Sequence, residues 1–152
     1  MNATTLVVGL GNPILGDDGV GWRVAEGLRP ALAGRDVDVA CLSLGGLALV
    51  EHLAGYRRAI IVDAMTTGAA PGTLHDVPAA DLAGARHTAS AHDLGLAAAL
   101  DLGRTLGLEL PEDIRVVGVE ALPDFAFRET LSTPVAEAIS GATARVLALL
   151  EG

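Results

Sequence analysis

The stretch GLGNPILGDDGVG, residues 9–21, joins a short apolar run to the start of an amphipathic segment. Glycine-rich turns between a strand and a helix often bind phosphate, through bare backbone N–H groups and a nearby lysine. Here Asp17 and Asp18 stand where the helix is expected to begin, and two carboxylates repel a phosphate. The acidic turn, residues 11–18, is therefore predicted to bind a cation or to activate water.

The sequence does not match either of two common nucleotide-binding motifs. The stretch begins like a dinucleotide fingerprint, but Ile14 stands where the third glycine is needed. The second predicted strand ends in Cys41-Leu42-Ser43, with no acid to hold a ribose. The Gly-Lys-Ser/Thr sequence of a phosphate-binding loop is absent as well. A simpler interpretation stays open, in which the glycines permit a tight turn and one aspartate caps a helix.

The composition predicts one compact domain, residues 1–152. Hydrophobic residues make up 51% and charged residues 19% of the chain, which is typical of a folded protein with a full core. The net charge of -9 argues against a nucleic-acid partner and against an anionic membrane surface. No apolar run has the length of a membrane span, and no signal-peptide pattern is present, so a cytoplasmic location is expected.

Apolar, β-branched runs alternate with helical patterns along the chain. Strands are predicted at residues 4–10, 37–42, 59–63, 73–77 and 114–119, the fourth of them at an edge. Helices are predicted at residues 20–32, 46–54, 90–106 and from 133 onward, with a single helical turn at 78–83. Short apolar strands separated by helices predict a three-layer α/β domain, with a mostly parallel sheet of about five strands sandwiched by helices.

Three residues are expected to shape the helix ends. Ser90 opens a Ser-x-x-Asp capping box, so a strong helix is predicted to begin there. Thr133 is the predicted N-cap of the last helix, because Pro134 then takes the first helical position. Pro30 is expected to loosen the end of the first helix.

Asp63 ends an apolar strand. A buried carboxylate without a partner costs several kcal/mol, so this side chain must bind something or reach solvent. It either accepts hydrogen bonds from the following turn, residues 64–68, or serves as a ligand at the carboxyl edge of the sheet. Ligands of such sheets bind beyond the carboxyl ends of the strands, where the acidic turn also falls.

The four histidines differ in their predicted settings. His92 falls in the first turn of the capped helix, where the helix dipole favours the neutral imidazole that a metal needs. An ordinary solvated histidine is the simpler interpretation. His52 is expected on a short helix, His75 on the edge strand and His87 in a loop. Cys41, the only cysteine, is predicted to be buried in a strand, so no cysteine nucleophile is expected.

Asp18, Asp63 and His92 together would form a set of two carboxylates and one imidazole. Such a set, with positions left open for water or substrate, suits a borderline divalent metal. The three residues are far apart in the chain, and their spacing alone does not bring them together.

Three segments resemble, in order, the signature segments of the hydrogenase maturation proteases. They are GLGNPILGDDGVG at residues 9–21, IIVDA at 60–64 and SAHDLGL at 90–96. The strand at 116–119 followed by Glu120, and the closing TPVAEAI helix, are also similar. The resemblance implies a twisted sheet sandwiched by helices. It also implies an endopeptidase that removes the C-terminal extension from the precursor of a nickel–iron hydrogenase large subunit.

The resemblance further implies that Asp18, Asp63 and His92 contact a metal. That metal is expected to be nickel already held by the precursor and used as a recognition handle, although other divalent cations fit the same ligands. Water activated by the metal, or by Asp17 or Asp18, is expected to attack the peptide carbonyl. The expected catalytic set is therefore these three ligands together with Asp17.

One departure and two alternatives stay open. The family often has Gly-Gly-Thr after the second strand, where this chain has Gly45-Gly46-Leu47, so the precursor served is not specified. A non-catalytic module that checks the precursor would need the same nickel contacts. A peptidyl-tRNA hydrolase also opens with GLGNP, but it expects a His-Asn pair where this chain has two aspartates, and the acidic charge disfavours tRNA.

Overall fold

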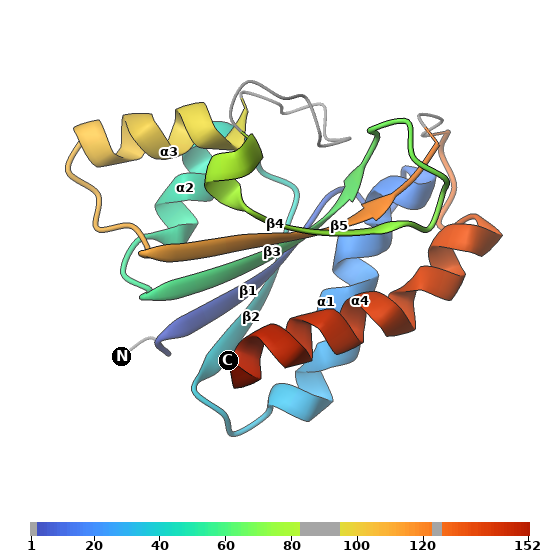
Figure 1. Ribbon diagram of the computed structural model, residues 1–152, viewed down its shortest axis with the longest axis horizontal. Helices are drawn as coiled ribbons and strands as arrows, with labels where there is room; N and C mark the ends of the chain where they lie inside the picture. Colours follow the sequence, from blue (N-terminus) through green and yellow to red (C-terminus); the bar gives the residue numbers. More distant parts are fainter. Residues whose placement is uncertain (1–2, 83–94, 123–125) are drawn as a thin grey trace.

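Parallel pairing of four strands, with a fifth added antiparallel, forms the sheet of this protein. The structure, a computed structural model, describes residues 3–82, 95–122 and 126–152. Within these residues the strand order is β2-β1-β3-β5-β4, and β4 pairs antiparallel with β5. The strands are β1 Thr5–Leu10, β2 Val37–Leu42, β3 Arg58–Met65, β4 Leu74–Pro78 and β5 Asp113–Glu120. Figure 1 shows their twist, and the predicted, mostly parallel sheet is confirmed.

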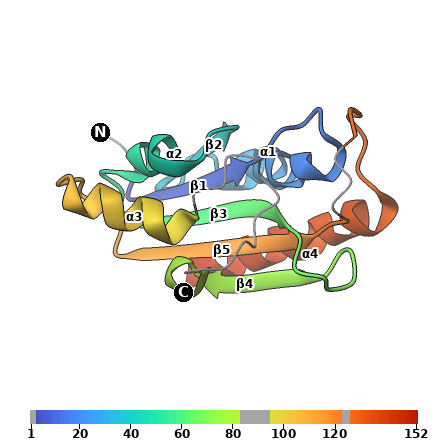
Figure 2. The ribbon, with the colours of Figure 1, turned by 90° about the horizontal axis from the view of Figure 1, so that it is seen from above.

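Helices cover both faces of the sheet (Figures 1 and 2). Helices α1 and α4 pack together on one face, and α2 and α3 pack together on the other. Two 3-10 turns, η1 and η2, follow β1 and β4. The bounds are η1 Gly16–Gly19, α1 Val20–Leu32, α2 Gly46–Leu53, η2 Ala79–Leu82, α3 Leu96–Thr105 and α4 Thr133–Glu151. The predicted sandwich of three layers is therefore confirmed.

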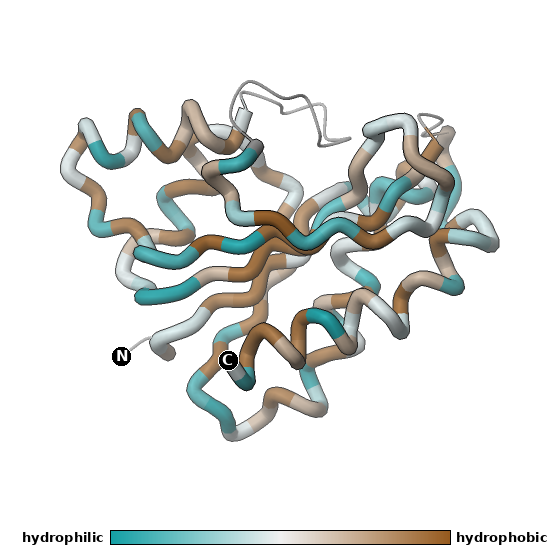
Figure 3. The backbone as a smooth tube through the Cα atoms, viewed as in Figure 1, coloured by the Kyte–Doolittle hydropathy of each residue, from teal (hydrophilic) through white to brown (hydrophobic). Residues whose placement is uncertain are grey.

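The core consists of aliphatic side chains in two layers. Strand β1 is buried along its whole length, and successive residues point to opposite faces. Val7 and Ile60 thus pack under α1 and α4, whereas Val8 and Ile61 pack under α2 and α3. Figure 3 shows the hydrophobic colour concentrated in these central strands. Within the described residues, no helix has the length and apolarity needed to cross a membrane.

Two glycines fix the path of the acidic turn. A Cβ atom on Gly21 would lie 2.3 Å from the carbonyl oxygen of Val62 and 2.5 Å from that of Leu10. Helix α1 therefore begins with its backbone against β1 and β3. Gly11 has a φ of +137°, and a Cβ atom there would lie 1.9 Å from the carbonyl oxygen of Asp18. The turn thus folds back over the end of β1, which only glycine at this position permits.

The helix ends correct two sequence predictions and agree with a third. Thr133 is the first residue of α4 and Ser132 is its N-cap, because Ser132 has the extended backbone of a cap. The helix predicted from Ser90 does not run unbroken, since Gly95 has a φ of +47° and α3 begins at Leu96. The capping box at residues 90–93 lies outside the described residues. Pro30 lies inside α1, which ends soon after it.

Strand β2 differs from prediction because it is an edge strand. All its residues, Cys41 included, are half-buried, so the predicted burial of Cys41 is wrong. The open side of β2 is not bare. Arg29 of α1 donates a hydrogen bond from Nη1 to the carbonyl oxygen of Val39 at 3.1 Å. On the inner side of β2, the Leu42 carbonyl accepts the backbone N–H of Gly11 and also the indole N–H of Trp22, each at 3.0 Å.

Candidate active site

All the buried acids of the described residues lie at the carboxyl edge of the sheet. Asp17 and Asp18 are 2% and 5% exposed in η1, Asp63 is 0% exposed in β3, and Glu120 is 1% exposed at the end of β5. Acidic side chains are almost never fully buried unless they are paired. Ligands of parallel sheets bind at this edge, so four buried carboxylates there mark a candidate site. It lies at the right-hand end of the sheet in Figure 1.

Asp18 is held by the acidic turn itself. Its Oδ2 atom accepts a hydrogen bond from the backbone N–H of Asn12 at 2.9 Å. Neither η1 nor α1 has a side-chain cap, so the interpretation of the aspartates as helix caps is wrong. The η1 turn also packs against β3, the strand that carries Asp63. The fold therefore brings the elements that carry two predicted ligands, Asp18 and Asp63, into contact.

Asp17 faces a different partner. Its Oδ1 accepts the backbone N–H of Ser132 at 2.7 Å, and its Oδ2 accepts the Ser132 hydroxyl at 2.8 Å. Beside it, the N–H of Gly16 donates to the Arg128 carbonyl, and the N–H of Arg128 donates to the Ile14 carbonyl. Asp17 thus ties the acidic turn to the segment that precedes α4. Its predicted catalytic role stays a prediction.

Asp63 lies inside β3 rather than at its end, because the strand continues to Met65. Its Oδ1 accepts the backbone N–H of Ala64 at 2.8 Å, so the predicted hydrogen bond to the following residues is confirmed. Across the sheet it is paired in register with Gly118 of β5. Its predicted role as a metal ligand stays a prediction.

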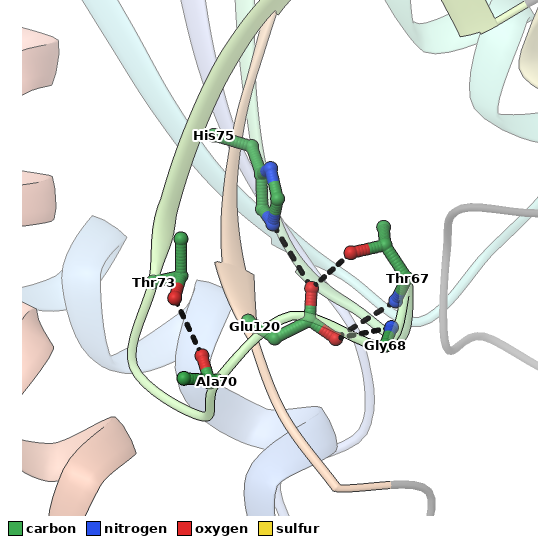
Figure 4. A network of polar contacts seen from close by, with 6 residues as sticks. All are labelled: Thr67, Gly68, Ala70, Thr73, His75 and Glu120. Carbon is green, nitrogen blue, oxygen red and sulfur yellow. Dashed lines mark hydrogen bonds and ion pairs between the residues drawn. The ribbon is translucent and has the colours of Figure 1, made fainter.

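Glu120 is the centre of a network that sequence reasoning missed (Figure 4). Its Oε1 accepts the Thr67 hydroxyl at 2.6 Å and the Nε2 atom of His75 at 2.9 Å. Its Oε2 accepts the backbone N–H groups of Thr67 and Gly68 at 2.7 and 3.2 Å. Burial alone raises the pKa of Glu120, but the hydrogen bonds from Thr67, His75 and Gly68 outweigh it and leave the pKa below its ordinary value.

A signal for Glu120 was present in the sequence. It follows an apolar strand, as Asp63 does, and so it also had to find partners or reach solvent. Its histidine partner had no such signal. His75 reaches Glu120 only because β4 runs antiparallel to β5, which pairs His75 with Gly118.

The other predicted residues have mixed outcomes. His92 and His87 lie outside the described residues, so the expected set of Asp18, Asp63 and His92 is neither seen nor excluded. Across residues 3–82, 95–122 and 126–152, no group of three His, Cys, Asp or Glu side chains is placed to hold a metal. Leu47, where the family often has Thr, is partly buried against the hydrophobic core under α2. It therefore contributes packing in place of a hydroxyl.

Cys41 is not set up as a nucleophile. Partial burial and a hydrogen bond to Glu26 raise its pKa to about 11. The thiol is therefore protonated at neutral pH, and the thiolate is the nucleophilic form. This agrees with the sequence-based expectation that no cysteine carries the chemistry.

Known proteins share both this fold and this sequence pattern. The sequence profile described as hydrogenase maturation protease matches residues 22–149, beginning just after the acidic turn. The Hydrogenase 2 maturation protease of Escherichia coli (strain K12) is 34% identical, over 95% of this chain and 89% of its own length. The hydrogenase expression/formation protein HupD of Rhizobium leguminosarum bv. viciae is 31% identical, over 90% of this chain and 69% of its own.

Solved structures agree. The hydrogenase maturating endopeptidase HybD from E. coli superimposes with a TM-score of 0.81 at 30% identity, covering 99% of this chain and 93% of its own. The α/β sheet with helices on both faces is thus the fold of a class of peptidases. The chain belongs to the hydrogenase maturation protease family, whose members are endopeptidases.

Proposed function

We propose that this protein removes the C-terminal extension from the precursor of a nickel–iron hydrogenase large subunit. The observation that carries the proposal is the set of buried carboxylates at the carboxyl edge of a fold that belongs to this family. Carboxylates held inside a protein are suited to bind a cation or to take a proton from water. The relatives named above are hydrogenase maturation proteins, which supports this kind of substrate.

The chemistry of the donors suits nickel that arrives with the substrate. Two carboxylates and one imidazole fit a borderline divalent ion, and Asp18, Asp63 and His92 supply them. In this proposal the nickel belongs to the precursor. These side chains bind it while the scissile segment lies against the acidic turn. Holding the reacting groups together can contribute about 7–11 kcal/mol to lowering the barrier.

Hydrolysis itself needs a water molecule and a base. We assign the base to Asp18, because the N–H of Asn12 orients its carboxylate and both oxygens of Asp17 already accept hydrogen bonds from Ser132. The base takes a proton from water as the oxygen attacks the peptide carbonyl. The C–N bond then breaks, and the leaving amine receives a proton.

The surface around the acidic turn supports a protein as substrate. Two large apolar side chains are exposed beside it, with Ile14 46% and Phe127 84% exposed. Ile14 and Phe127 flank the paired residues Leu15 and Arg128, so both are close to the turn. Exposed apolar side chains that gather at one place are typical of protein contact surfaces.

The test is a processing assay with purified precursor, with and without nickel loaded. Loss of a C-terminal peptide, detected by mass spectrometry, is expected only for the nickel-loaded precursor and wild-type protein. Asp18→Asn and Asp63→Asn keep the side-chain size and are expected to lower the rate by about a hundredfold or more. Binding without any mass change would instead favour a non-catalytic checkpoint module. Absence of binding would contradict both functions.

A cytoplasmic location is part of the same proposal. The free thiol of Cys41 is compatible with a reducing compartment. Cell fractionation followed by immunodetection tests it, and recovery in an extracytoplasmic fraction would contradict it.

A further inference from the structure

Glu120 forms hydrogen bonds with both ends of the loop between β3 and β4, residues 66–73. At its start, the N–H groups of Thr67 and Gly68 donate to the Glu120 carboxylate. At its end, the N–H of Gly72 donates to the Glu120 carbonyl, and the N–H of Glu120 donates to the Thr73 carbonyl, both at 2.8 Å. Glu120, the last residue of β5, thus holds together the two ends of the loop that joins β3 to β4.

In these hydrogen bonds the charged group is buried, whereas the loop residues that donate to it are exposed. Thr67 and Gly68 are exposed, yet the carboxylate that holds them is 1% exposed. A buried carboxylate must have its hydrogen-bonding capacity filled, and here four donors fill it. Because the four donors come from Thr67, Gly68 and His75, any shift of the loop leaves a buried charge partly unsatisfied. The loop conformation is therefore strongly determined.

The loop is also the continuation of the strand that carries Asp63. Met65 is paired in register with Glu120, and Asp63 with Gly118. Residues 66–68 consequently emerge at the carboxyl edge next to Asp63, on the right in Figure 1 and close up in Figure 4. Residues 66–68 therefore directly follow the strand that carries Asp63, at the edge where ligands of parallel sheets bind.

We propose that Glu120 is a positioning residue for peptide cleavage, which fixes residues 66–68 as a rigid wall beside Asp63 for the substrate segment. The inference rests on the proposed function. Glu120 itself does not touch the reacting atoms, because Thr67, Gly68 and His75 enclose its carboxylate. Its effect is exerted through the geometry of the loop, and a displacement of 1 Å near a reacting group can cost about a hundredfold in rate.

The loop supplies a matched pair of variants. Thr67→Val removes the hydroxyl that donates to Glu120, whereas Thr73→Val removes a hydroxyl that donates to the Ala70 carbonyl in the same loop. Both threonines are exposed, and both changes are isosteric. In the processing assay we expect Thr67→Val to lower kcat by about 3- to 10-fold with KM within about twofold of wild type. Thr73→Val is expected to keep the wild-type kcat, and Thr67→Ser to restore it.

Glu120→Gln gives the stronger effect, with kcat lowered by about 10- to 100-fold, because an amide cannot accept all four hydrogen bonds. Hydrogen exchange at the Gly68 amide provides an independent readout, which should accelerate in Thr67→Val and not in Thr73→Val. Wild-type kcat in both Thr67→Val and Glu120→Gln would overturn the inference. So would equal losses in Thr67→Val and Thr73→Val, because they would show general loop stability alone.

The outcomes separate this inference from the proposed function. If wild-type protein cleaves the precursor and the Thr67 and Glu120 variants cleave equally well, only the positioning role is wrong. If wild-type protein does not cleave the precursor at all, the proposed function is wrong, and the role of Glu120 in cleavage is refuted with it.

Discussion

The carboxylate of Asp17 accepts both the backbone N–H and the hydroxyl of Ser132, the N-cap residue of α4. Asp17 and Asp18 are neighbours in the chain, but they have different partners. Asp17 bonds to a residue far along the sequence, whereas Asp18 bonds to Asn12 in its own turn. The two acids are therefore expected to respond differently to the same substitution.

Asp17→Asn should lower the free energy of unfolding by about 1–3 kcal/mol, because a buried, charge-assisted pair of hydrogen bonds is weakened. Its processing rate, measured well below the melting temperature, should stay within about threefold of wild type. Ser132→Ala serves as the control, and it should cost about 1 kcal/mol, since it removes only the hydroxyl. If Asp17→Asn were fully stable but inactive, Asp17 would be the catalytic base instead.

Gly21 and Gly27 both lie in α1, but substitution by alanine is expected to change stability in opposite directions at the two positions. Gly21→Ala places a methyl group 2.3 Å from the Val62 carbonyl oxygen, and we expect a loss of stability of about 3 kcal/mol or more. Gly27 is exposed, and a methyl group added there would meet no neighbouring atom within 4 Å, so Gly27→Ala should stabilise the helix by about 1 kcal/mol. Urea denaturation measures both. Equal effects would contradict the close contact of α1 with β3.

Glu120 should make stability depend on pH in the acid range. Its pKa in the folded protein lies below the ordinary value of 4.5, so its contribution is fully present above that pH. The contribution is lost as the pH falls through the lowered folded pKa. The difference in unfolding free energy between wild type and Glu120→Gln should therefore be present in full at about pH 5 and shrink below about pH 4. A difference that stays constant into this acid range would contradict the prediction.

Phe127 is expected to act in substrate binding and not in folding. It is 84% exposed, so Phe127→Ser should leave the melting temperature unchanged. If the precursor covers the surface beside the acidic turn, KM should rise by about 10-fold with little change in kcat. Leu106, which is 61% exposed and follows α3 at the opposite end of the sheet, provides Leu106→Ser as the control. Equal KM values for the two variants would place the contact elsewhere.

The sheet was predictable because its signals are local. The buried strands are continuous apolar runs, such as the one around Val62, with one acid near the carboxyl end of β3 and another at the end of β5. The acidic turn was also predictable in outline, because no nucleotide motif fits it. Cys41 was placed wrongly because an apolar run does not show whether its strand lies at the centre or the edge of a sheet.

The contacts of the site were less predictable because they join distant segments. Nothing near Asp17 in the sequence identifies Ser132, and nothing near Glu120 identifies His75. The N-cap of α4 was placed one residue late for the same reason. Ser132 uses its hydroxyl on Asp17, so it makes no side-chain cap of its own helix. Pattern alone also does not show that Gly95 adopts a positive φ and separates α3 from the residues before it.

Arg29 has a consequence for how copies of this protein behave at high concentration. An uncovered edge strand is a template on which another chain can add a strand and begin to aggregate. Because the Arg29 guanidinium already bonds to the Val39 carbonyl, one backbone acceptor of β2 is withheld from such pairing. An ion pair with Glu26, at 3.1 Å, holds the guanidinium in this position. The tendency of the protein to aggregate thus depends in part on Arg29, a side chain remote from the site of cleavage.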